Sequence, residues 1–107
     1  MHIQFNSDNQ TPLGATDAEQ IESAVGAKLE RIADRVTRVE VHVSDINGPR
    51  RGAGDKRCMI EIRPNGMGPI SATDQAPTIQ GAVSGAAEKV LTAFERQVGK
   101  ATTRKGY

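Results

Sequence analysis

The fold is decided by an alternating stretch in the middle of the chain, Thr37-Arg38-Val39-Glu40-Val41-His42-Val43-Ser44-Asp45. Valines occupy every second position from Val39 to Val43, and charged or polar side chains lie between them. Because successive side chains of a strand point to opposite faces of a sheet, this period of two predicts a strand over residues 37–45. One face of that strand is expected to be buried and the other to contact water.

Sequence on both sides of this stretch repeats the alternation. Residues 57–63 alternate in the same way and predict another strand, which the turn residues 64–66 end. A short fourth strand is predicted at Ile70 and Ala72. At the N-terminus, residues 1–5 also alternate between polar and apolar side chains, so the chain is expected to begin with a strand.

A helix is predicted between the first two strands. Thr16, followed three residues later by Glu19, has the spacing of a capping box, in which two side chains satisfy free N–H groups at a helix start. Apolar side chains then recur at intervals of three or four, which is the period of one helix face. They are Ile21, Val25, Leu29, Ile32 and Val36. The sequence therefore predicts a helix over residues 17–35 that buries one stripe.

A second helix is predicted to begin within residues 74–77, with Pro77 in its first turn, where the missing N–H of proline has no partner to lose. Its buried stripe is expected to comprise Ile79, Val83, Val90, Phe94 and Val98. Beyond the helix, residues 101–107 form a basic tail that we expect to be flexible.

The predicted elements follow the order β-α-β-β-β-α. A strand, helix and strand in succession form a right-handed crossover with parallel strands, and the later strands fit an antiparallel meander. We therefore expect an α+β fold, a two-layer sandwich in which both helices cover one face of a four-stranded mixed sheet. A chain of 107 residues suits a single domain, here residues 1–100, followed by the tail over 101–107.

Composition excludes several classes of protein. No run approaches the ~18 apolar residues that span a bilayer, and the N-terminus lacks the pattern of a signal peptide. Cys58 is the sole cysteine and cannot form an intrachain disulfide, which fits a reducing compartment. We expect a cytoplasmic protein with no membrane partner.

Catalytic and metal-binding chemistry finds little support in the sequence. His2, His42 and Cys58 are potential ligands, but they lack the spacing of a zinc site. The parity of Cys58 in its strand points inward, so a buried thiol is favoured over a nucleophile. We expect no enzymatic activity, no metal, no cofactor and no small-molecule substrate.

Positive charge is unevenly distributed, although the formal net charge is +1. Residues 1–27 contain four acidic and no basic residues, whereas the rest of the chain holds all fourteen basic residues against nine acidic ones. Such segregation indicates a polarised surface.

The basic side chains of the predicted helices gather in strips beside the apolar stripes, at about 100° per residue. Those of the first helix are Lys28, Arg31 and Arg35. Those of the second helix are Lys89, Arg96 and Lys100. Glu88 and Glu95 are placed on the outer face beyond the second strip. In parallel helices one strip points into the groove between them and the other toward an edge.

A surface of this kind suits the phosphates of a nucleic acid. The alternative is that the basic side chains solvate ordinary helix faces and pair with nearby carboxylates. The first interpretation requires the positive side chains to share a surface and to remain largely unneutralised.

The glycine-rich segment 48–57 adds Arg50 and Arg51 to the positive charge. Its glycines would let the backbone approach a phosphate, but it lacks the Gly-Lys-Ser/Thr ending and the following helix of a P-loop. A phosphate-contacting loop and a plain exposed hairpin loop both remain open. The outward positions of the predicted sheet carry no Phe, Tyr or Trp, so bases cannot stack there as on an RRM sheet. Any nucleic acid must bind through helices and loops.

The chain resembles the ribosome hibernation promoting factor family, also called ribosome-associated inhibitor A or sigma-54 modulation protein. The resemblance is carried by residues 38–49 leading to Asp55-Lys56-Arg57-Cys58-Met59-Ile60-Glu61, and by Ala82-Val83-Ser84-Gly85-Ala86-Ala87-Glu88-Lys89-Val90-Leu91 in the second helix. It extends over nearly the whole chain and rests on overall pattern.

The resemblance implies a fold similar to double-stranded RNA-binding domains. It also implies a protein that binds the small ribosomal subunit and its rRNA, occludes the mRNA and tRNA sites, and blocks translation under stress or in stationary phase. We expect the free protein to be monomeric. The implied rRNA contacts are Lys28, Arg31 and Arg35 on the first helix and Lys89, Arg96 and Lys100 on the second, with Arg50 and Arg51 added from the loop.

Two features depart from the family pattern. Long members carry a second domain that pairs ribosomes, and this chain is expected to lack it, so direct bridging of ribosomes is not expected. The second helix carries Thr92, Glu95 and Gly99 where further basic residues are common. A function of another class also remains open, that of a protein-interaction regulatory module using the exposed sheet face.

Overall fold

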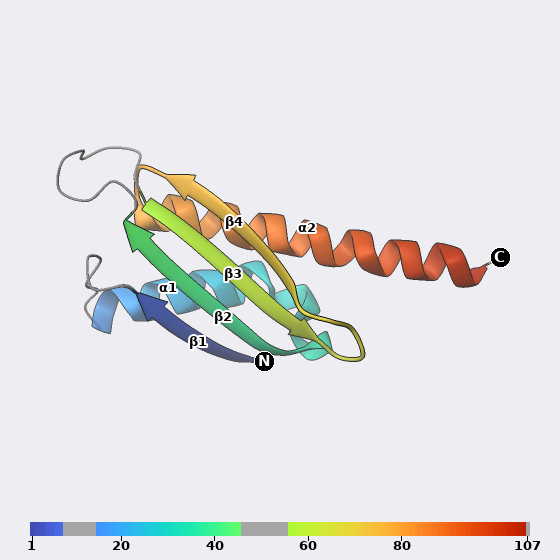
Figure 1. Cartoon of the computed structure of the whole chain (residues 1–107). Helices are drawn as coiled ribbons and strands as arrows, with labels where there is room; N and C mark the ends of the chain where they lie inside the picture. The colour runs from blue at the N-terminus through green and yellow to red at the C-terminus, as the bar shows by residue number, and fades with distance from the viewer. Residues whose placement is uncertain (8–14, 46–55, 107) are drawn as a thin grey trace.

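The computed structural model describes residues 1–7, 15–45 and 56–106, and Figure 1 draws the remaining residues as a thin grey trace. The described elements are β1 (His2–Ser7), α1 (Ala15–Lys28), the 3-10 helix η1 (Glu30–Arg35), β2 (Val36–Asp45), β3 (Lys56–Pro64), β4 (Ile70–Ala76) and α2 (Ile79–Gly106). This is the predicted order β-α-β-β-β-α.

The four strands form one mixed sheet in the order β1-β2-β3-β4. β1 pairs with β2 in parallel, and β2–β3 and β3–β4 are antiparallel. Val41 of β2 lies opposite Phe5 on one side and Ile60 on the other, so apolar residues of neighbouring strands meet on the same face. The predicted α+β sandwich with a four-stranded mixed sheet is confirmed.

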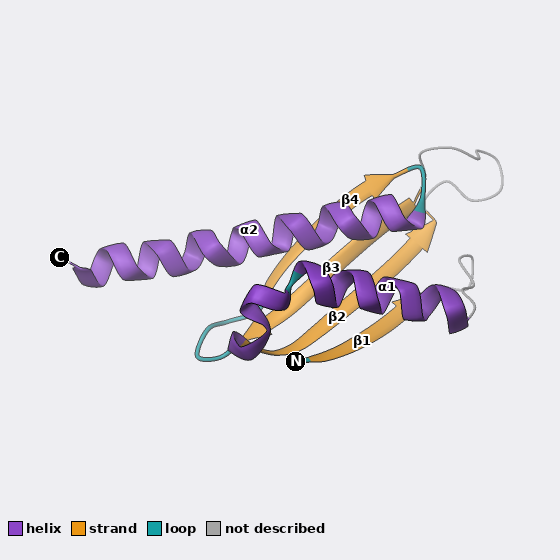
Figure 2. Cartoon of the chain, turned by 180° about the vertical axis from the view of Figure 1, so that it is seen from behind, coloured by secondary structure: helices purple, strands orange, loops and turns teal. Residues whose placement is uncertain are grey.

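Both helices cover one face of this sheet and run in parallel (Figure 2). α2 packs against β3 and β4, and α1 lies beside it on the β1 side. The C-terminal part of α2 extends beyond the sheet, which makes the molecule elongated, with extents of 54 × 23 × 18 Å.

The core lies between the helices and the sheet. The predicted stripe of the first helix is buried throughout, from Ile21 to Val36, and Val83, Val90 and Phe94 of α2 face it. Val39, Val41 and Val43 close the core from the sheet side. Cys58 is fully buried among them, as its inward parity predicts.

The prediction of one continuous α-helix over residues 17–35 is wrong. α1 starts at Ala15 and ends at Lys28, and the chain tightens into η1, where the Ile32 N–H donates to the Leu29 carbonyl three residues back. The end of η1 is fixed from outside: the Asn65 N–H, in the β3–β4 turn, donates to the Arg35 carbonyl at 2.9 Å. This turn is possible because Gly66 adopts a φ of +75°.

The second helix begins at Ile79, later than the predicted start within 74–77. Residues 70–76 instead remain extended because they pair with β3 along the length of the strand, up to Ala76 opposite Lys56. Thr78 caps the helix, since its Oγ1 accepts a hydrogen bond from the Gly81 N–H at 3.0 Å. At the other end, residues 101–106 continue α2 as helix, and the predicted flexibility of this segment stays a prediction.

Candidate nucleic-acid interface

The strip of the first helix faces the groove between the helices, as the parallel arrangement predicts. Lys28 ends α1 and its Nζ lies 3.6 Å from Glu88 Oε1 of α2. Arg31, in η1, directs Nη2 and Nε at Glu95 Oε2 from 2.7 and 2.8 Å. Both pairs are partly exposed, since the accessible fractions of the four side chains run from 38% for Lys28 to 69% for Glu88. The groove is thus bridged by two exposed ion pairs.

This arrangement corrects the predicted position of the acidic residues. Glu88 and Glu95 were expected on the outer face of the second helix, beyond its basic strip, but they face the cations of the first helix. The seven-residue interval between them is two helical turns, so both point the same way. Angular arithmetic placed them relative to their own helix axis, whereas the position of α1 decides what they meet.

Arg35 completes the strip through a different contact. Its guanidinium carbon lies 5.2 Å from the centroid of the Phe94 ring, within the range of a cation–π interaction. The side chain of Phe94 is buried, so its ring is fixed by the core. Because a ring face neutralises no charge, Arg35 keeps its full positive charge at the surface.

The strip of the second helix points to the β4 edge. Lys89 Nζ donates to Asp74 Oδ1 of β4 at 3.0 Å. This hydrogen bond is the main reason that the pKa of Asp74 lies below its ordinary value. The carboxyl rests above Gly85, where a Cβ atom would lie 2.7 Å from Asp74 Cγ. Arg96 follows Lys89 by two turns on the same side, is exposed, and makes no ion pair with any described residue.

Three predicted contacts are not placed by the structure. Arg50 and Arg51 lie outside the described residues. Lys100 belongs to the backbone of α2, four residues after Arg96, but its side chain is also outside the described part. Of the remaining five predicted residues, Lys28, Arg31 and Arg35 share one side of the helix layer, while Lys89 and Arg96 lie on the other side of α2.

Small side chains line the floor between the helices. A cavity of about 310 Å³ opens there, bordered by Ala24, Ala27, Lys28, Ser84 and Ala87. Because none of these side chains except Lys28 is long, a rigid polyanion can approach the helix backbones closely beside the ion pairs.

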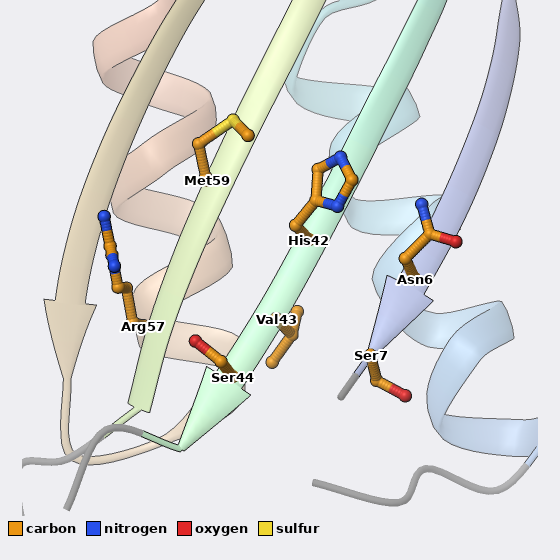
Figure 3. Close-up of a pocket in the computed structure, with 7 residues that line it drawn as sticks. All are labelled: Asn6, Ser7, His42, Val43, Ser44, Arg57 and Met59. Atoms are coloured by element: carbon orange, nitrogen blue, oxygen red, sulfur yellow. The ribbon is translucent and has the colours of Figure 1, made fainter. Parts of the chain in front are cut away.

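The opposite face of the sheet is polar and partly self-paired. Arg38 contacts both Gln4 and Glu40, and Glu61 lies 3.7 Å from Arg63. A shallow cavity of about 410 Å³ at one end of this face is lined by Asn6, Ser7, His42, Val43, Ser44, Arg57 and Met59 (Figure 3). Arg57, the last residue of the glycine-rich segment 48–57, belongs to β3 and is exposed there.

The Cys58 thiol is not an activated nucleophile. Burial first, and the Asp74 charge second, raise the pKa of the Cys58 thiol to about 12. Residues 1–7, 15–45 and 56–106 contain no group of three or more His, Cys, Asp or Glu side chains that could hold a metal ion. Within the same part of the chain, no helix has the length and apolarity needed to cross a bilayer.

The fold defines the class as a two-layer α+β domain, with both helices on one face of a four-stranded mixed sheet. A ribosomal subunit interface protein from Coxiella burnetii matches 92% of this chain and 99% of its own, with a TM-score of 0.69 and 17% identity. The N-terminal domain of Thermus thermophilus Protein Y matches 90% and 98% of the two chains, with a TM-score of 0.68 and 20% identity. A comparison with curated proteins found no significant match.

The family model described as sigma 54 modulation protein / S30EA ribosomal protein matches residues 7–105, so the chain belongs to this family. This confirms the family indicated by the sequence. Family membership assigns the chain to ribosome hibernation and ribosome-associated regulation of translation.

Proposed function

We propose that this protein inhibits translation without catalysis, by binding the small ribosomal subunit in the cytoplasm and occluding its mRNA and tRNA sites under stress or in stationary phase. Lys28, Arg31 and Arg35 contact rRNA phosphates from the groove side, and Lys89, Arg96 and Lys100 contact them from α2. Arg50 and Arg51 add contacts from their loop. The observation that carries the proposal is that Lys28, Arg31 and Arg35 of a member of this family lie together at the groove between the helices.

The ion pairs of Lys28, Arg31 and Lys89 bear directly on this proposal, because paired cations offer less charge to phosphates. All three cations are more than a third exposed, and exposed ion pairs contribute only about 0–1 kcal/mol. The cost of replacing each carboxylate with a phosphate is of the same size, and a site that engages several cations together can offset it. Arg35 and Arg96 need no such exchange, since neither has a carboxylate partner among the described residues.

Occlusion follows from shape once the molecule is bound. A folded molecule with extents of 54 × 23 × 18 Å occupies the path of a nucleic acid strand without any chemical step. The helix layer supplies attraction through phosphates, which position a protein on RNA whatever the base sequence. The polar sheet face remains turned away from that contact.

Charge reversal on the helix layer tests the proposal. Lys28→Glu with Arg96→Glu is expected to weaken cosedimentation with small subunits by about tenfold or more and to flatten the salt dependence by ~0.7–0.9 in log slope per lost phosphate contact. The matched control is Arg57→Glu with Arg63→Glu, which makes the same charge change on the open sheet face. Wild-type affinity in the control is the expected result.

The reverse result would favour the other function considered. If the sheet-face variant lost its partner while the helix variant kept it, the exposed sheet face would be the binding surface of a protein-interaction module. If wild-type protein never cosedimented with small subunits, ribosome occlusion would be rejected whatever the variants did.

A further inference from the structure

The acidic residues Glu88 and Glu95 hold two of the cations to which the proposed function assigns rRNA phosphates. Glu88 is paired with Lys28 and Glu95 with Arg31, all on the exposed rim of the groove. Neither carboxylate is needed for the core, since both side chains are 44% or more accessible. Surface ion pairs of this kind also contribute little to stability. Their conspicuous effect is to neutralise the groove in the free protein.

We propose that Glu88 and Glu95 are specificity-determining residues, which hold the groove cations in internal ion pairs and so suppress binding to RNA in general. The inference rests on the proposed function, in which those cations contact rRNA. Non-specific binding to nucleic acid is driven almost entirely by the counterions that phosphates release when protein cations bind them. A cation that is already paired with a carboxylate binds phosphates less well and therefore releases fewer counterions.

A matched rRNA site meets a different situation. It presents phosphates to Lys28, Arg31 and Arg35 together, and Arg35, which packs on the Phe94 ring, has no carboxylate to give up. It also approaches the small side chains of the groove closely. These additional contacts repay the exchange of carboxylate for phosphate. A flexible RNA that touches one or two cations at a time gains too little to displace the carboxylates, so the pairs penalise the wrong partner more than the right one.

The test compares two double variants with equal charge changes. Glu88→Gln with Glu95→Gln removes the groove carboxylates and keeps their shape. Glu19→Gln with Glu22→Gln is the control, because both residues are exposed on α1 and form no ion pair within the described chain. Each protein is titrated against a fluorescent single-stranded oligouridylate over a range of salt and is sedimented with purified small subunits, after thermal melts confirm the fold.

The groove variant is expected to bind oligouridylate about tenfold more tightly at low salt, with a log-log salt slope steeper by about 1.5. Its affinity for small subunits should rise less than its affinity for oligouridylate. The ratio of the two affinities, which measures the preference for the subunit, should therefore decrease. The control variant should stay within about twofold of wild type for oligouridylate.

The inference would be overturned if the groove variant bound oligouridylate no more tightly than wild type. It would also be overturned if the control variant showed the same gain in affinity as the groove variant. Failure of the proposed function would give a different result, because wild-type protein would then not sediment with small subunits at all. In that case a tighter groove variant would still show that the carboxylates restrain RNA binding, whereas an unchanged one would reject both.

Discussion

At the scale of single residues, the absence of a side chain at Gly85 leaves room for the Asp74 carboxyl that pairs with Lys89. An added Cβ would overlap the Asp74 carboxyl, with 2.7 Å to Cγ, so Asp74 and β4 would have to move. Gly85→Ala is therefore expected to destabilise the fold by about 1 kcal/mol, because crowding outweighs the better helix propensity of alanine. Gly99→Ala is the control, since nothing lies within 4 Å of its Cβ position.

Urea denaturation of the two variants measures both effects. Gly99→Ala is expected to be neutral or more stable by up to ~1 kcal/mol, as alanine replaces glycine in an exposed helix interior. Equal stabilisation by the two substitutions would show that Asp74 does not constrain α2 at this point.

At the scale of elements, the start of α2 depends on Thr78 rather than on residues 74–77. Its Oγ1 accepts from the Gly81 N–H, and its carbonyl accepts from the Ala82 N–H. Thr78→Ala should cost about 1 kcal/mol of stability, measured by thermal melting. Thr92→Ala, at an exposed position inside the same helix, should cost nothing; a comparable loss there would contradict a capping role for Thr78.

At the scale of the whole molecule, the buried thiol of Cys58 links stability to alkaline pH. Burial raises its pKa from the ordinary 9.0 to about 12, so the folded state holds the proton more tightly than the unfolded chain. The contribution is complete below pH 9.0 and is lost as pH rises toward 12. Unfolding free energy should fall by up to ~1.4 kcal/mol per pH unit within that window.

Cys58→Val removes this proton linkage while keeping an apolar side chain in the core. Urea unfolding at about pH 8 and about pH 10 should show a smaller alkaline loss of stability in the variant than in wild type, because only wild type has a thiol to deprotonate on unfolding. Identical losses would mean that the thiol does not keep its proton in the folded state.

Much of the architecture was predictable from periodicity. Alternation of Val39, Val41 and Val43 specified β2, and the stripe from Ile21 to Val36 specified the buried face of the first helix. These patterns indicate which side of a helix or strand faces the core. That side can be predicted from the segment's own apolar residues, without knowing which elements pack against it. The family followed from the order of these elements and the residues that they carry.

The sequence by itself thus determined the strands, the two helices, their buried faces and the family. Tertiary structure decided where the first helix tightens, that β4 continues to Ala76, and that Glu88 and Glu95 meet the cations of the first helix. The physical reason is that a helical period fixes each side chain only around its own axis. What that side chain contacts depends on how two helices settle side by side on a sheet, which no single segment encodes.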